Sequence, residues 1–303
     1  MEIGIVGLGR MGANMTRRLA RGGAQVVAFD VSPVARASVE SEKSVTAVAD
    51  LEAVSAALRA PRVVWLMLPA GAVTQSTLNE LVPLLQRGDV VVDGANAYYK
   101  DSMQRATQLA AHGLHFADAG VSGGIWGLQN GYAIMLGASA EAARHVIPFV
   151  KILAPAPDRG WAHCGPAGSG HFVKMVHNGI EYGMMQAFAE GLSLMHAKTE
   201  FNLDLAAISE TWRHGSVVRS WLLDLIAEFL NKDSVLEHVA PVVADSGEGR
   251  WTALEAVELG IPAPVMSLAL MMRFASQGQH DYAGKLLAMM RNSFGGHAIK
   301  AEP

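Results

Sequence analysis

The sequence has little cysteine, little charge and no long hydrophobic run. Cys164 is its single cysteine among 303 residues, so no disulfide can form within the chain and a reducing compartment is expected. Only 17% of residues are charged and the formal net charge is −4, which lacks the basic excess of a nucleic-acid-binding surface. Apolar runs are broken by Gly or Pro well short of the ~20 residues that span a bilayer. The first residues, MEIGIVGLG, have no basic segment typical of a secretory signal. We therefore expect a cytoplasmic protein with no nucleic-acid or membrane partner.

The first half of the chain alternates β-rich runs with helical stretches. Strands are expected at 3–7, 26–30, 63–68, 90–93, 115–120 and 132–136. These runs are continuously apolar, which suits parallel strands covered on both faces. Helical periodicity at 13–21 and 140–153 completes the alternation, which predicts an α/β fold with a doubly wound parallel (Rossmann) sheet.

The second half has a different pattern. Strand signals stop after about residue 160, and from 170 onward Leu, Met and Ala recur at three- and four-residue spacing, which predicts an all-α region. Between them, WAHCGPAGSG is rich in small residues. We expect a cofactor-binding domain at 1–163 and a helical domain for substrate and dimerisation at 164–303.

The segment GLGRMG has the spacing of a dinucleotide-binding turn. Its members are Gly7, Leu8, Gly9, Arg10, Met11 and Gly12. The turn follows an N-terminal strand and begins a helix. Gly7 permits the tight turn, Gly9 lets the backbone approach a pyrophosphate, and Gly12 allows the helix to pack closely on the sheet. Asp30 ends the second expected strand, where a carboxylate can accept from both ribose hydroxyls and repel a 2′-phosphate. The pattern predicts NAD as the cofactor, although Asp30 could also cap the following VSPVARAS.

Five polar residues share one expected helical face. Lys174, His177, Asn178, Glu181 and Tyr182 are spaced i, i+3, i+4, i+7 and i+8. A solvated face is the ordinary interpretation, but the flanking Met and Ile leave little room for another buried face. Lysine and glutamate two turns apart, about 10 Å along the axis, could act on opposite ends of a small substrate.

Several segments together resemble the 6-phosphogluconate dehydrogenase family. They are VDGANAYYKD, GVSGGIWGLQNGYAIMLGA, GHFVKMVHNGIEYGMMQ, GRWTALEAVELGIP and RNSFGGH, and they cover nearly the whole chain. The length is similar to that of the short, NAD-preferring branch, which lacks a second helical repeat. The resemblance implies oxidative decarboxylation of 6-phosphogluconate to ribulose 5-phosphate and CO2, with no metal.

The resemblance also implies roles for individual residues. Lys174 would be the base for the C3 hydroxyl and Glu181 the acid that protonates C1, although Glu181 could merely anchor the helix. Asn96 would contact both cofactor and substrate. The residues implied for substrate binding are Asn96, Ser122, Gly123, Gly124, His177, Asn178, Tyr182, Arg273, Arg291 and His297. The last two would come from the neighbouring subunit, which implies a homo-oligomer. Longer members carry a lysine where Ser246 stands, and Arg250 is a possible replacement.

Two other interpretations remain open. The chain could be another β-hydroxyacid dehydrogenase, such as one acting on 3-hydroxyisobutyrate, which would share the glycine turn, the Ser-Gly-Gly loop and Lys174. Such an enzyme would not need His177, Glu181 or an arginine from a second subunit. A non-catalytic cofactor sensor would be expected to lose Lys174 or Glu181, and both are present.

Overall fold

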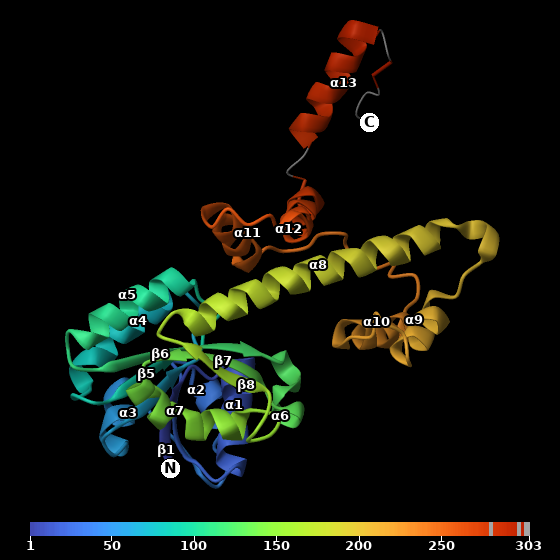
Figure 1. The fold of residues 1–303 in the computed structure, drawn as a ribbon. Coiled ribbons are helices and arrows are strands. Elements are labelled where there is room, and N and C mark those ends of the chain that lie inside the picture. The colour runs from blue at the N-terminus through green and yellow to red at the C-terminus, as the bar shows by residue number, and fades with distance from the viewer. Residues whose placement is uncertain (279–280, 296–297, 300–303) are drawn as a thin grey trace. The chain divides into compact units, whose positions relative to one another are not determined.

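The chain forms two compact units, Met1–Val176 and His177–Pro303. The structure is a computed structural model that describes residues 1–278, 281–295 and 298–299 (Figure 1). The long helix α8 (Ser169–Ala197) runs through the division, so its N-terminal part belongs to the first unit and the rest to the second.

An eight-stranded sheet forms the centre of the first unit, in the order β3-β2-β1-β4-β5-β6-β7-β8. The strands are β1 (Glu2–Val6), β2 (Gln25–Phe29), β3 (Val45–Ala47), β4 (Val63–Leu66), β5 (Val90–Asp93), β6 (His115–Ser122), β7 (Ala133–Ala138) and β8 (Trp161–Gly165). All neighbouring pairs are parallel except β6 with β7. The strand order reverses between β1 and β4, and ligands of doubly wound folds bind outside the carboxyl ends of strands at such a point.

Helices cover both faces of this sheet. Helices α1 (Arg10–Arg21) and α7 (Ala140–Leu153) pack on one face, while α3 (Leu51–Ala57), α4 (Ala72–Leu81) and α5 (Tyr99–Ala110) pack on the other. The central strand β5 has Val90 and Val92 in the first core and Val91 in the second, all with no exposed surface. Burial on both sides is the reason that the strand is continuously apolar. The remaining elements of this unit are α2 (Pro33–Ala37), α6 (Gly127–Asn130) and the short 3-10 helices η1 (Val82–Leu84) and η2 (Gly124–Trp126).

Most of these elements agree with the sequence pattern. All six expected strands are present, and the helix expected at 140–153 has those bounds. Strands β3 and β8 were not predicted, because β3 has only three residues and β8 carries the polar His163 with two of its residues exposed, so neither is an apolar run. The statement that strands end near residue 160 was therefore wrong. The predicted doubly wound parallel sheet is confirmed, with one antiparallel pair, β6 with β7. The connection between these two strands is only a short loop with two small helices, and a parallel return needs a longer crossover.

The described part of the second unit is helical, as expected. After α8 come η3 (Thr199–Phe201), α9 (Leu205–Arg213), α10 (Trp221–Lys232), α11 (Glu248–Glu258), α12 (Pro264–Ser276) and α13 (Asp281–Gly295). Helices α9 and α10 pack together, and Arg213 joins them through Asp224 at 3.0 Å. Helices α11 and α12 form a second pair. Among the residues described, no helix is both long enough and apolar enough to cross a membrane.

Candidate active site

The turn between β1 and α1 has the geometry of a phosphate-binding loop. Gly7 has a φ of +96°, and a Cβ on Gly12 would overlap the carbonyl of Gly7, so both positions require glycine. A Cβ on Gly9 would meet nothing within 4 Å. Among the described side chains, none caps the N-terminus of α1. Its first N–H groups, together with the open space at Gly9, can therefore receive an anion.

Asp30 follows β2 and faces the same turn. Its Oδ2 accepts the N–H of Leu8 at 2.7 Å, and its Oδ1 accepts the N–H of Ser32 at 2.8 Å. The expected cap on the next segment comes instead from Ser32, whose Oγ accepts the N–H of Ala35 at the start of α2. The Asp30 carboxylate is thus held in place by the backbone, with lone pairs left for further donors.

Two cavities adjoin the turn. The larger, about 730 Å³, is lined by four carboxylates, namely Asp30, Asp50, Glu52 and Glu80, with no lysine or arginine among its described lining residues. The smaller, about 230 Å³, joins residues 9–12 to Asn96 and Val121. A dinucleotide fits this arrangement, because the open space at Gly9 lies between an acidic pocket suited to ribose hydroxyls and a cleft that reaches Asn96. The acidic pocket would repel a 2′-phosphate, which favours NAD over NADP.

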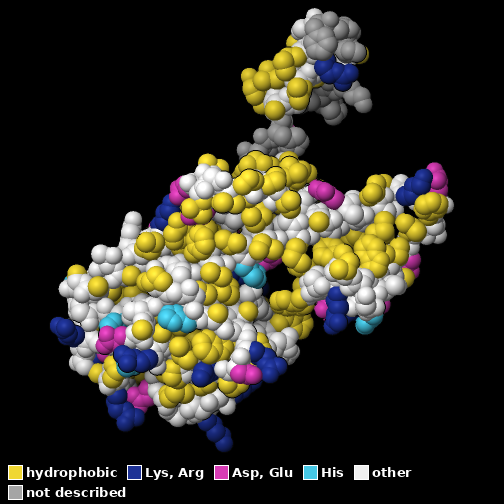
Figure 2. Space-filling view, in the orientation of Figure 1, with side chains coloured by type: hydrophobic (Ala, Val, Ile, Leu, Met, Phe, Trp, Pro, Cys, Tyr) yellow, Lys and Arg dark blue, Asp and Glu magenta, His cyan; other side chains and the backbone are white. Residues whose placement is uncertain are grey.

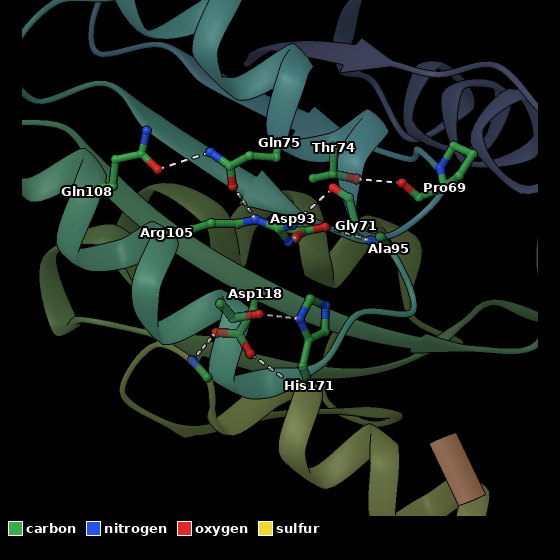
Figure 3. Close-up of polar contacts among 12 residues, drawn as sticks. Pro69, Gly71, Thr74, Gln75, Asp93, Ala95, Arg105, Gln108, Asp118 and His171 are labelled. Atoms are coloured by element: carbon green, nitrogen blue, oxygen red, sulfur yellow. Dashed lines mark hydrogen bonds and ion pairs between the residues drawn. The ribbon is translucent and has the colours of Figure 1, made fainter. Parts of the chain in front are cut away.

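A buried ion pair fixes the two loops beside these cavities. Arg105 on α5 donates to Asp93, which ends β5, at 2.7 Å, and both side chains are almost fully buried. Arg105 also donates to Gln75 and to the carbonyl of Gly71, as Figure 3 shows. The other Asp93 oxygen accepts the N–H of Ala95 at 3.0 Å. The pair therefore ties the loop after β4 to the loop that carries Asn96.

The N-terminus of α8 is anchored on β6 by Asp118. This carboxylate has no exposed surface and accepts the N–H groups of Gly168, at 2.5 Å, and His171, at 2.7 Å (Figure 3). Burial raises the pKa of Asp118, while the neighbouring His171 and these N–H groups act in the opposite direction. The His171 ring is also buried, and its Nδ1 lies 2.7 Å from Ser102 Oγ.

Lys174 lies one turn further along α8, against the same strand. Its side chain is buried, with the residue 8% exposed. A Cβ on Gly120 would overlap Lys174 Cβ and would lie 2.9 Å from the carbonyl of Gly170. The bare glycine backbone of β6 therefore allows α8 to approach closely enough for Lys174 to be seated there. Ser122 ends the same strand, half-buried, and Gly123 and Gly124 follow it at positive φ.

The polar stripe of α8 divides into a buried row and a more exposed row. Lys174, Asn178 and Tyr182, four residues apart, are all buried. His177 and Glu181 retain 43% and 40% of their side-chain surface, and His177 Nδ1 lies 3.8 Å from Glu181 Oε2. Of the apolar residues that flank the stripe, Met175 is buried, whereas Ile180 and Met184 are 52% and 39% exposed.

Tyr182 lies in a second polar cluster within the helical unit. Its hydroxyl donates to Glu248 Oε2 at 3.4 Å, and Ser246 Oγ donates to the same oxygen at 2.6 Å. The Arg273 guanidinium lies over the Tyr182 ring, 3.5 Å from its centroid. Burial raises the pKa of the Tyr182 hydroxyl, and the negative charge of Glu248 adds to the rise.

The other basic candidates have different surroundings. Arg250 forms an ion pair with Asp245 and stacks on Phe274 at 4.6 Å, so its charge is already engaged. Arg291 lies exposed on α13. The expected role of His297 lies outside the described residues.

Four residues that position these side chains were not predicted from the sequence, namely Asp93, Asp118, His171 and Glu248. Two of them had a visible signal, because Asp93 ends the apolar run VVVD and Asp118 interrupts HFADAG, and a carboxylate in a buried strand needs a partner.

Comparison with known proteins identifies the family. Residues 2–164 match the model described as the NAD binding domain of 6-phosphogluconate dehydrogenase, and residues 170–300 match the model of its C-terminal domain. The chain belongs to the 6-phosphogluconate dehydrogenase family. A relative from Haloferax volcanii, named 6-phosphogluconate dehydrogenase, NAD(+)-dependent, decarboxylating, is 40% identical over 99% of this chain and 98% of its own length. A Saccharomyces cerevisiae member is 36% identical over 95% of this chain but only 61% of its own length.

Solved structures agree with this assignment. A Plasmodium falciparum 6-phosphogluconate dehydrogenase, described with its cofactor NADP+ and with its substrate 6-phosphogluconate, has a TM-score of 0.83 at 28% identity, covering 100% of this chain and 67% of that one. A 3-hydroxyisobutyrate dehydrogenase from Salmonella typhimurium has a TM-score of 0.76 at 22% identity, covering 92% and 95% of the two chains, which shows a shared fold. This 6-phosphogluconate dehydrogenase family member thus has the length of the short Haloferax relative.

Proposed function

We propose that the protein catalyses the NAD-dependent oxidative decarboxylation of 6-phosphogluconate to ribulose 5-phosphate and CO2. The observation that carries the proposal is Lys174, buried against Gly120 and followed two turns later on α8 by Glu181. A potential base and a potential acid on one helix, in a member of the 6-phosphogluconate dehydrogenase family, support this proposal.

The two residues would act in sequence on the substrate. Bound NAD would supply the acceptor for the hydride that leaves C3. Lys174, in its neutral form, would take the C3 hydroxyl proton at Nζ, and burial favours that form. The 3-keto acid loses CO2 because its carbonyl accepts the electron pair of the breaking bond. Glu181 would then protonate C1 of the enediol, and its half-exposed carboxyl can exchange its proton with water.

The cofactor would be held by residues of the first unit. Residues 7–12 and the N-terminus of α1 would bind the pyrophosphate, Asp30 the ribose hydroxyls, and Asn96 would face the smaller cleft. We propose that residues 1–163 serve the cofactor and residues 164–303 the substrate and the oligomer. We expect a cytoplasmic location on the strength of the single cysteine.

The substrate would be held along its length by polar side chains and loop backbone. Ser122, with the N–H groups of Gly123 and Gly124, suits the C1 carboxylate. Asn96, His177 and Asn178 suit the sugar hydroxyls. Tyr182, Arg273, Arg291 and His297 are proposed for the distal phosphate, because guanidinium groups match phosphate oxygens.

We propose further that the protein is a homo-oligomer in which Arg291 and His297 complete the neighbouring subunit's site. Exposed apolar side chains on α13 support a partner, including Leu287 at 58% and Met290 at 52% (Figure 2). Mixing inactive Lys174→Ala and Arg291→Ala chains would rebuild one intact site per hybrid dimer. Random exchange should restore about a quarter of wild-type activity, and verified hybrids without activity would count against shared sites.

One assay tests the proposed reaction. The wild-type protein should form NADH with 6-phosphogluconate and not with 3-hydroxyisobutyrate, and CO2 should be released in equal amount. A higher kcat/KM with 3-hydroxyisobutyrate would refute the proposal in favour of another β-hydroxyacid dehydrogenase. A higher kcat/KM with NADP than with NAD would refute the role given to Asp30, and Asp30→Ala should reduce the preference for NAD.

A further inference from the structure

A carboxylate lies buried in the cluster proposed for the distal phosphate. Glu248 is only 2% exposed and is the first residue of α11. Two hydroxyls donate to its Oε2, Ser246 at 2.6 Å and Tyr182 at 3.4 Å. A helix N-terminus also stabilises negative charge. Glu248 is therefore a buried carboxylate whose Oε2 is enclosed by two hydroxyl groups.

The charges around this carboxylate cancel. Asp245 forms an ion pair with Arg250, and the Asp245 side chain is only 4% exposed. That leaves Glu248 and Arg273 as the other carboxylate and guanidinium beside Tyr182. These four residues therefore carry no net positive charge, and any excess of positive charge at the phosphate must come from Arg291 and His297, which are proposed to belong to the neighbouring subunit.

The hydroxyl protons are also committed. Tyrosine and serine each carry a single hydroxyl proton, and a phosphate dianion offers only acceptors. Ser246 donates its proton to Glu248, and the Tyr182 hydroxyl lies 3.4 Å from both Glu248 Oε2 and Ser246 Oγ, so both protons have acceptors within the cluster and lone pairs are left for any other ligand. A phosphate must compete with the carboxylate for these two donors.

We propose that Glu248 is a specificity-determining residue. Its carboxylate holds the Tyr182 and Ser246 hydroxyl protons and lowers the affinity of this subsite for a phosphate dianion relative to a less charged terminal group. This inference rests on the proposed function, since that function places the substrate phosphate beside Tyr182 and Arg273.

The test is Glu248→Gln, which removes the charge and keeps the shape. KM for 6-phosphogluconate should fall about tenfold while kcat changes little, because the lost repulsion acts equally before and during reaction. Calorimetric titration with inorganic phosphate should show tighter binding by a similar factor. A role confined to holding the fold would raise KM instead. Glu258→Gln, an exposed change at the end of the same helix, is the matched control and should alter neither value.

A second variant keeps the proposal testable if Glu248→Gln fails to fold. Glu248→Ser also removes the charge and leaves a hydroxyl that can donate, so it should also lower KM and tighten phosphate binding. Unchanged or raised KM in a folded Glu248→Gln variant, or in Glu248→Ser if only that one folds, would overturn the inference. A wild-type protein inactive with 6-phosphogluconate would instead refute the proposed function. The phosphate titration would still show whether the Glu248 carboxylate weakens phosphate binding.

Discussion

The Asp118 carboxylate on β6 accepts the backbone N–H of His171, in the first turn of α8, at 2.7 Å. The second oxygen accepts the N–H of Gly168, just before the helix begins. One buried side chain thus satisfies two N–H groups at the start of the helix that carries Lys174, and so fixes where that helix begins.

Asp118→Asn should make stability respond differently to pH. Burial raises the pKa of Asp118 above its usual value of 3.8. At a pH between 3.8 and the raised pKa of the folded state, the folded protein binds a proton at Asp118 that the unfolded chain does not. Lowering the pH through this range therefore stabilises the wild type. Asparagine cannot take up this proton. The free energy of unfolding of the wild type, relative to the variant, should therefore rise as pH falls from 7 towards about 4. Urea unfolding at several pH values measures this, and a difference that shrinks on acidification would contradict it.

Gly120→Ala should impair catalysis more than cofactor binding. The added methyl would overlap Lys174 and press on the carbonyl of Gly170, so α8 must move away from β6. A displacement near 1 Å can reduce turnover about 100-fold. Kinetics with 6-phosphogluconate and a separate NAD titration measure the two effects. Gly191→Ala, in a part of α8 where a Cβ meets nothing within 4 Å, is the control and should keep its activity. Normal turnover by Gly120→Ala would show that the close approach of α8 to Gly120 is not needed to position Lys174.

Gly9→Ala and Gly12→Ala should fail in different ways. A Cβ on Gly9 meets only open space, so the variant should unfold at the wild-type temperature but bind NAD about tenfold more weakly, since the methyl blocks the approach of the pyrophosphate. A Cβ on Gly12 overlaps the Gly7 carbonyl, which should lower the free energy of unfolding by about 1–3 kcal/mol. Thermal unfolding and NAD titration separate them. Tight NAD binding by Gly9→Ala would exclude this turn as the phosphate site.

Lys174→Met and Glu181→Gln should stop the reaction at different steps. General acid–base groups contribute about 10²–10⁴-fold, so both should lose most turnover while retaining NAD affinity. In a single turnover Glu181→Gln should still reduce NAD, because hydride leaves before C1 is protonated, whereas Lys174→Met should not. Stopped-flow absorbance follows the NADH, and ketopentose release is measured separately. Near-normal ketopentose release by Glu181→Gln would leave that residue only an anchoring role for α8.

The sequence alone determined the class of fold and the residues that are candidates for catalysis and ligand binding. Glycines at 7, 9 and 12, continuous apolar strands and a polar stripe on α8 are local patterns, and each depends on spacings that neighbouring residues set. For the same reason β3 and β8 were not predicted, since edge strands need no apolar run, and the apolar pattern of β7 did not indicate its antiparallel direction.

Only the tertiary structure decided which polar groups meet. Asp118 lies 50 residues before Gly168, Asp93 lies 12 before Arg105, and Tyr182 lies 66 before Glu248. No local period links such partners, because the packing of strands and helices brings them together. The structure also decided that Lys174, Asn178 and Tyr182 are buried while Ile180 is exposed. Burial depends on what covers a helix face, and a sequence pattern records only which residues share it.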